Sequence, residues 1–191
     1  MKVVAFNGSA RKDGNTSMLI NYVFEELEKE GIETEQVQLA GEHPHGCIAC
    51  YKCFKNKNRR CDVESDCINK CIEKMLAADG IILASPTYFA NLSTEIKALI
   101  DRSGMTSRAN DDMLQRKVGA AVVAQRRGGA VHVFDSINHF FTIGQMIIVG
   151  SSYWNFANGR DRGEVADDTE GVETMRTLGR NMAWLLKKIR K

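Results

Sequence analysis

The sequence has no long apolar run and no excess of charge of either sign. Its 191 residues include 26 Lys and Arg against 24 Asp and Glu, a formal net charge of +2. This balance gives no reason to expect a nucleic-acid or membrane partner. No segment is apolar for long enough to form a transmembrane helix or the central part of a signal peptide, so we expect a cytoplasmic protein.

Internal repeats, low-complexity tracts and linker-like segments are also absent, so we expect a single domain over residues 1–191. Six cysteines could form a disulfide framework in a small secreted protein. In a cytosolic chain, four cysteines crowded into one loop, at about residues 41–65, more often indicate metal or redox chemistry.

Short apolar runs alternate five times with segments of helical spacing. The runs predict strands at residues 2–7, 34–39, 80–84, 118–124 and 146–149. The first predicted helix is capped by Thr16 or Ser17 and ends at Gly31. The other predicted helices lie near residues 68–76, 93–102, 131–142 and 172–189. This alternation favours an α/β, flavodoxin-like three-layer sandwich with a five-stranded parallel sheet in the order 2-1-3-4-5.

A polar, glycine-containing loop joins the first strand to the first helix, at the sheet edge where open α/β folds bind ligands. It has neither the GxGxxG dinucleotide motif nor the GK[ST] ending of a Walker loop. Backbone N–H groups and a helix N-terminus favour an anion, which points to a small phosphorylated cofactor such as FMN. The alternative is an ordinary polar turn. The predicted cofactor-binding residues here are Ser9, Arg11, Gly14, Asn15, Thr16 and Ser17.

A second loop follows the third strand and is expected to face the same crevice, because strands one and three are neighbours. Proline stiffens this loop, its aromatic rings offer flat apolar surface, and its polar side chains can bond the edge of an isoalloxazine ring. The alternative is a turn whose aromatics cover the core. The predicted residues are Pro86, Thr87, Tyr88, Phe89 and Asn91, and Gly128 in the loop after the fourth strand is a further candidate.

The cysteine spacing Cys47-x2-Cys50-x2-Cys53-x7-Cys61 is typical of a compact iron-sulfur site. Zinc sites more often use two separated pairs. Cys67 and Cys71 lie four residues apart on a predicted helix, and we interpret them as small packing residues rather than ligands.

The segments GSARKDGNTS and SPTYFANLSTEIKALIDR, with the five βα units, resemble the NADPH-dependent FMN reductase family over nearly the whole length. The cysteine motif is similar to that of the iron-sulfur flavoproteins, a subgroup that carries a 4Fe-4S cluster beside FMN. The resemblance implies that FMN binds the two loops and that the cluster binds the four cysteines. It also implies a homodimer or homotetramer, because clusters in this subgroup approach the FMN of a neighbouring subunit. The implied cluster ligands are Cys47, Cys50, Cys53 and Cys61.

We therefore expect an oxidoreductase that passes electrons between a one-electron partner and FMN. The basic residues Lys55, Lys57, Arg59 and Arg60 either form a solvated loop or steer an acidic partner such as a ferredoxin. One alternative is a clusterless NAD(P)H-dependent FMN or quinone reductase, and another is a flavodoxin-like carrier without enzymatic activity. No residue is an evident general acid or base, so the catalytic residues are left unassigned.

Overall fold

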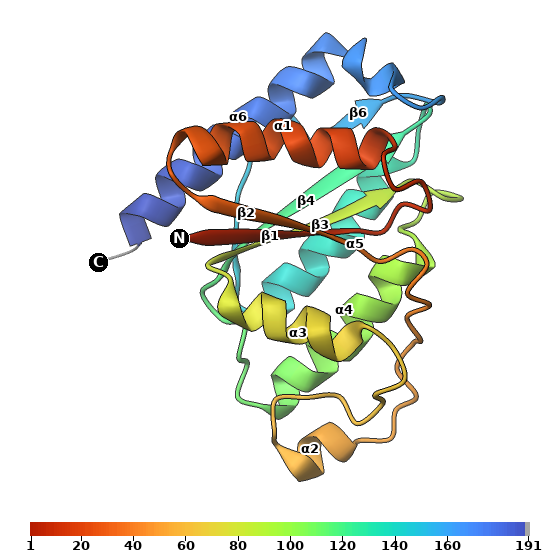
Figure 1. The fold of residues 1–191 in the computed structure, drawn as a ribbon, viewed down its shortest axis with the longest axis vertical. Helices are drawn as coiled ribbons and strands as arrows, with labels where there is room; N and C mark the ends of the chain where they lie inside the picture. The colour runs from red at the N-terminus through yellow and green to blue at the C-terminus, as the bar shows by residue number, and fades with distance from the viewer. Residues whose placement is uncertain (190–191) are drawn as a thin grey trace.

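A parallel β-sheet forms the centre of the protein, which is seen here in a computed structural model that describes residues 1–189. The strands are β1 (Lys2–Asn7), β2 (Glu33–Gln38), β3 (Gly80–Pro86), β4 (Val118–Gln125), β5 (Ile147–Ile148) and β6 (Phe156–Asn158). Their order is β2-β1-β3-β4-β5, and all pairings are parallel. The predicted order 2-1-3-4-5 is confirmed (Figure 1).

Two short strands share the edge beside β4. Strand β5 pairs with the beginning of β4 and β6 pairs with its end. Between them the chain leaves the sheet and exposes Tyr153 and Trp154, whose ring centroids lie 4.9 Å apart. The long segment after the fifth predicted strand therefore contains sheet structure that its sequence did not indicate.

Helices cover both faces of the sheet (Figure 1). The α-helices are α1 (Asn15–Lys29), α2 (Lys52–Asn56), α3 (Ile68–Ala77), α4 (Thr94–Ala109), α5 (Ala130–Ile143) and α6 (Thr169–Ile189), and the 3-10 helix η1 is Glu164–Ala166. Helices α1 and α6 lie on one face, while α3, α4 and α5 lie on the other. Helix α2 belongs to the cysteine-containing connection between β2 and α3.

The strands read as continuous apolar runs because both of their faces are buried. In β1, Val3 and Ala5 pack with α1 and α6, whereas Val4 and Phe6 pack with α3, α4 and α5. All four side chains are 0% exposed. Such two-sided burial is characteristic of parallel sheets, which helices cover on both sides.

Several helix ends differ from their predicted positions. Helix α1 begins at Asn15 with Gly14 as its N-cap, so the expected cap at Thr16 or Ser17 is wrong. Helix α4 continues to Ala109, well past the predicted end at residue 102. Its last two turns carry few apolar residues, and buried hydroxyls such as Ser103 Oγ bond back onto the helix, to the Leu99 carbonyl at 2.6 Å.

Candidate functional site

A crevice of about 170 Å³ lies where the loops after β1, β3 and β4 meet residues 159–160. Seven of the twelve predicted cofactor-binding residues line it: Ser9, Arg11, Asn15, Thr16, Pro86, Thr87 and Tyr88. The remaining lining residues are Ala124, Gln125, Arg126, Gly159 and Arg160. Loops at the carboxyl ends of neighbouring strands thus form one concave site, as expected for this topology.

Internal hydrogen bonds hold the loop after β1 and leave the start of α1 uncapped. The Ser9 N–H donates to Asn7 Oδ1 at 2.9 Å, and the Arg11 N–H donates to Ser9 Oγ at 3.2 Å. No side chain caps the N-terminus of α1 at Gly14. The exposed Arg11 guanidinium reaches only the Arg160 carbonyl, at 3.3 Å, among the residues that the structure describes. A free helix N-terminus beside a cation favours a phosphate group.

Two of the predicted phosphate-loop residues use their side chains for contacts within the protein. Asn15 Nδ2 donates to the Asp161 carbonyl at 2.9 Å, and Asn15 Oδ1 accepts from the Gly163 N–H at 2.8 Å. Ser17 is buried and its hydroxyl accepts from Gln36 Nε2 at 2.9 Å. Phosphate binding by Asn15 and Ser17 stays a prediction, and it would have to use their main-chain N–H groups.

The loop after β3 presents an unsatisfied polar atom. The Thr87 N–H donates to the Ala124 carbonyl at 2.8 Å, which fixes the loop against β4. Thr87 Oγ1 is buried without a hydrogen-bond partner in the part of the chain that the structure describes. Because an unpaired buried hydroxyl is costly, its position in the lining of the crevice fits a ligand that bonds it.

The next four residues form a tight turn at the rim of the crevice. Tyr88 and Asn91 exchange both backbone hydrogen bonds, at 2.9 and 3.0 Å. Phe89 and Ala90 between them have φ of 49° and 58°, a left-handed conformation that is strained for residues other than glycine. The Phe89 ring is fully exposed, so the turn holds an aromatic side chain out into solvent. Neither Phe89 nor Asn91 lines the crevice.

The loop after β4 enters the crevice through Gln125 and Arg126 rather than through Gly128. Gln125 Oε1 accepts from the Ala130 N–H at 3.0 Å and so caps α5. Gly128 is exposed, with open space around its Cα, so its part in cofactor binding stays a prediction. Arg126 and Arg160 add positive charge to the crevice and are not among the predicted site residues.

A separate small cavity is lined by all four predicted cluster ligands, Cys47, Cys50, Cys53 and Cys61. Cys53 is buried and Cys61 is partly buried, whereas Cys47 and Cys50 are exposed. Over residues 1–189, no three His, Cys, Asp or Glu side chains are close enough together to hold a metal ion. The donor set suits an iron-sulfur cluster, and the loop would have to draw the thiols together around it.

Helix α2 carries Cys53 and is flanked by left-handed residues. Tyr51 precedes it with φ of 55°, and Lys57 follows it with φ of 45°. Cys53 Sγ lies 4.0 Å from the Met105 carbonyl oxygen of α4. Burial raises the pKa of the Cys53 thiol, so a metal that binds there must displace its proton.

Arg102 and Asp66 form a buried ion pair beneath the same loop, and their side chains are 0% and 1% exposed. Burial raises the pKa of Asp66, but the N–H groups of His45 and Ile68 and the Arg102 guanidinium outweigh that effect and leave the pKa below its ordinary value. The Arg102 Nε–H donates to Cys61 Sγ at 3.2 Å. No local sequence pattern indicates this pair, because its members lie 36 residues apart.

Cys67 and Cys71 belong to the core rather than to the cysteine cavity. Both are buried in the cluster of apolar side chains beneath α3. The pKa of the Cys71 thiol is raised, because it hydrogen-bonds to Cys67 and is buried. Neither residue lines the cavity of the other four cysteines, which agrees with the packing role that we expected.

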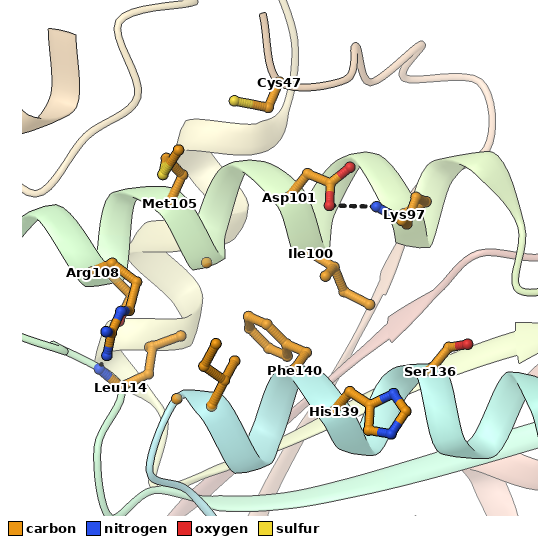
Figure 2. Close-up of a pocket in the computed structure, with 14 residues that line it drawn as sticks. Cys47, Lys97, Ile100, Asp101, Met105, Arg108, Leu114, Ser136, His139 and Phe140 are labelled. Carbon is orange, nitrogen blue, oxygen red and sulfur yellow. Dashed lines mark hydrogen bonds and ion pairs between the residues drawn. The ribbon is translucent and has the colours of Figure 1, made fainter. Parts of the chain in front are cut away.

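A third hollow, of about 550 Å³, lies between α4 and α5. Figure 2 shows Ile100 and Phe140 pointing into it from the two helices, with Cys47 at its rim. Lys97 and Asp101 on α4 form an ion pair at 2.5 Å, so their charges neutralise each other at the edge of the hollow. No predicted cofactor-binding residue of the loops after β1 and β3 lines this hollow, whereas seven of them line the smaller crevice.

The sheet order and the crevice at its carboxyl edge define a flavodoxin-like fold. The fold is similar to that of a WrbA-like flavodoxin from Agrobacterium tumefaciens, with a TM-score of 0.65 and 17% sequence identity. The match covers 98% of this chain and 97% of that one.

The chain belongs to the NADPH-dependent FMN reductase family, whose sequence model matches residues 1–161. An iron-sulfur flavoprotein of Methanocaldococcus jannaschii is 37% identical over 198 aligned positions that cover 100% of both chains. Another, from Methanosarcina thermophila, is 34% identical over 193 positions that cover 100% of this chain and 98% of the other. Within residues 1–189, no helix combines the length and the apolar character that crossing a membrane requires.

Proposed function

We propose that this protein is an iron-sulfur flavoprotein, an oxidoreductase that binds FMN in the crevice and a 4Fe-4S cluster at the four cysteines. The observation that carries the proposal is that Cys47, Cys50, Cys53 and Cys61 line one cavity. Full-length relatives at 31% to 37% identity bear the name iron-sulfur flavoprotein, which supports the same function.

The crevice supplies what FMN needs. Arg11 and the free N-terminus of α1 would hold the phosphate, and the unpaired Thr87 hydroxyl would bond a polar edge of the flavin. When bound, FMN takes up electrons in pairs and releases them singly, whereas an iron-sulfur cluster passes them one at a time. The chain itself contributes orientation and charge, and no side chain of the crevice is assigned as a proton donor.

The proposal includes an acidic, ferredoxin-like electron partner. Lys55, Lys57 and Arg59 are exposed around α2, next to the cysteine cavity. Arg60 is already paired with Glu73 and contributes less. A cationic patch beside a redox site speeds encounter with an anionic partner. NAD(P)H is the alternative donor, and a homodimer or homotetramer is the proposed assembly.

The test is the metal and flavin content of protein that is prepared and reconstituted without oxygen. We expect one FMN and about four irons per chain, as a 4Fe-4S cluster requires. Cys50→Ala should lose the cluster and keep FMN, because the crevice and the cysteine cavity share no lining residue. Cys67→Ala serves as the matched control and should keep the iron. Zinc or no metal in the wild type, together with quinone reduction by NAD(P)H, would establish a clusterless reductase instead.

A further inference from the structure

Arg102 is buried, and the donors of its guanidinium are taken up by the cysteine loop and its surroundings. Nη1 donates to the His45 carbonyl at 3.2 Å and to Asp66, and Nη2 donates to the Val63 carbonyl. A further donor, the Nε–H, points at Cys61 Sγ at 3.2 Å. A side chain that starts on α4 thus binds the loop at its beginning, at its end and at one thiol.

The charge of Arg102 is balanced within the protein. Asp66 pairs with it, and Asp66 Oδ2 also accepts from the His45 N–H at 2.8 Å. Asp66 Oδ1 accepts from the Ile68 N–H at 3.1 Å. A buried ion pair is held firmly when each partner is fully hydrogen-bonded. Because Arg102 is neutralised and cannot rotate freely, its Nε–H acts as a fixed donor to the sulfur.

Cys61 is restrained a second time through its main chain. Asn69 Oδ1 accepts from the Cys61 N–H at 2.8 Å, and Asn69 Nδ2 donates to the Cys61 carbonyl at 2.9 Å. Asn69 therefore fixes the peptide, whereas Arg102 contacts the thiol. The two restraints can be removed separately, so the effect of the sulfur contact can be distinguished from that of a disturbed loop.

We propose that Arg102 is a positioning residue for the iron-sulfur cluster: it orients the Cys61 thiolate and, by donating a hydrogen bond to it, makes the cluster easier to reduce. The inference rests on the proposed function. A donor to a ligand sulfur draws electron density from the metal centre and favours the reduced, more negative state. In residues 1–189, the other three cavity cysteines receive no side-chain N–H donor, so this influence is confined to one ligand.

The first test compares Arg102→Lys with Asn69→Ala. Lysine keeps the positive charge beside Asp66 but has no Nε–H at that place. We expect about a tenfold fall in the ratio of reduced to oxidised cluster at a fixed potential. This corresponds to a reduction potential that is lower by about 59 mV for a one-electron couple. Asn69→Ala should change this ratio less than threefold even if it lowers iron retention. Equal shifts in the two variants, or none in Arg102→Lys, would show that Arg102 does not act through the sulfur.

The second test uses the wild-type fold and does not depend on whether Arg102→Lys folds. Protein that carries ¹⁵Nε-arginine should show a ¹⁵N hyperfine coupling to the reduced cluster in pulsed EPR. The coupling should persist in Arg60→Lys, whose arginine is paired with Glu73 instead. A loaded cluster without arginine coupling refutes the role of Arg102 and leaves the proposed function standing. A wild-type chain that takes up no iron refutes both.

Discussion

Arg11 and Lys12 are neighbouring cations that differ in their relation to the crevice. Arg11 lines it, whereas Lys12 is exposed outside it. We expect Arg11→Ala to weaken FMN binding by about 1.5–3 kcal/mol, because it removes a charge-assisted contact to the phosphate. Lys12→Ala removes the same charge from the adjacent position and should leave the affinity nearly unchanged. Fluorescence titration of apoprotein with FMN measures both, and equal losses would mean that general charge rather than contact binds the phosphate.

Thr87 offers a change with opposite effects on stability and binding. Thr87→Val keeps the shape of the side chain but removes a buried hydroxyl that has no partner within residues 1–189. The flavin-free protein should become more stable by up to about 1 kcal/mol, while FMN affinity should fall by about 0.5–1.5 kcal/mol. Urea unfolding of apoprotein and FMN titration provide the two values. A variant that is less stable and binds FMN normally would show that the hydroxyl has a structural partner instead.

At the level of single residues, sequence position predicted the crevice better than it predicted side-chain roles. Ser9, Arg11 and Thr16 line the crevice because a loop between a buried strand and a helix must lie at the sheet edge. The amide of Asn15 instead holds a segment 146 residues away. The Arg102–Asp66 pair could not be predicted either. Its members come together only in the tertiary structure, so no local sequence pattern indicates the contact.

Helices α1 and α6 approach closely at a glycine. A Cβ placed on Gly179 would lie 2.6 Å from the Val23 carbonyl oxygen, which cannot move without disturbing α1. We expect Gly179→Ala to destabilise the fold by about 1–3 kcal/mol through overpacking. Gly104→Ala in α4 is the matched control, because its Cβ would meet only Phe140 at an ordinary 3.5 Å. The control should be neutral or more stable by up to about 1 kcal/mol, since alanine is the better helix former.

Thermal or chemical unfolding of both glycine variants provides the comparison. A stable Gly179→Ala would mean that the two helices can separate at little cost.

Elements buried on both faces were predicted well, and elements held by specific contacts were not. β1 spans the predicted residues 2–7 because every side chain after the first is buried and four of these five are apolar. Helix α2 was missed because it has only five residues and left-handed residues at both ends. Strand β6 was missed because it forms by pairing with the end of β4, and its own three residues do not predict a strand.

Acid sensitivity is a property of the whole molecule, and Glu26 contributes to it. Hydrogen bonds from Lys29 and Arg176 lower the pKa of this carboxyl below its ordinary 4.5, against the opposing effect of burial. A lowered pKa stabilises the folded state above about pH 4.5, and this stability is lost as the pH falls through the folded pKa. Because Arg176 lies on α6, protonation loosens the contact of α6 with α1.

Glu26→Gln tests this contribution. The variant should be less stable than the wild type at pH 6, and the difference in unfolding free energy should shrink as the pH falls towards 3. Denaturant unfolding at several pH values measures the difference. A gap that stays constant or widens in acid would show that Glu26 acts through packing alone.

The separation of the crevice from the cysteine cavity has a consequence for how the gene can change over time. The two sites are lined by different residues, and the four cysteines lie in a single connection between β2 and α3. A substitution in that connection alters no atom that lines the crevice. Natural selection can therefore adjust or discard the thiols in one copy of a duplicated gene, and that copy still inherits a complete crevice.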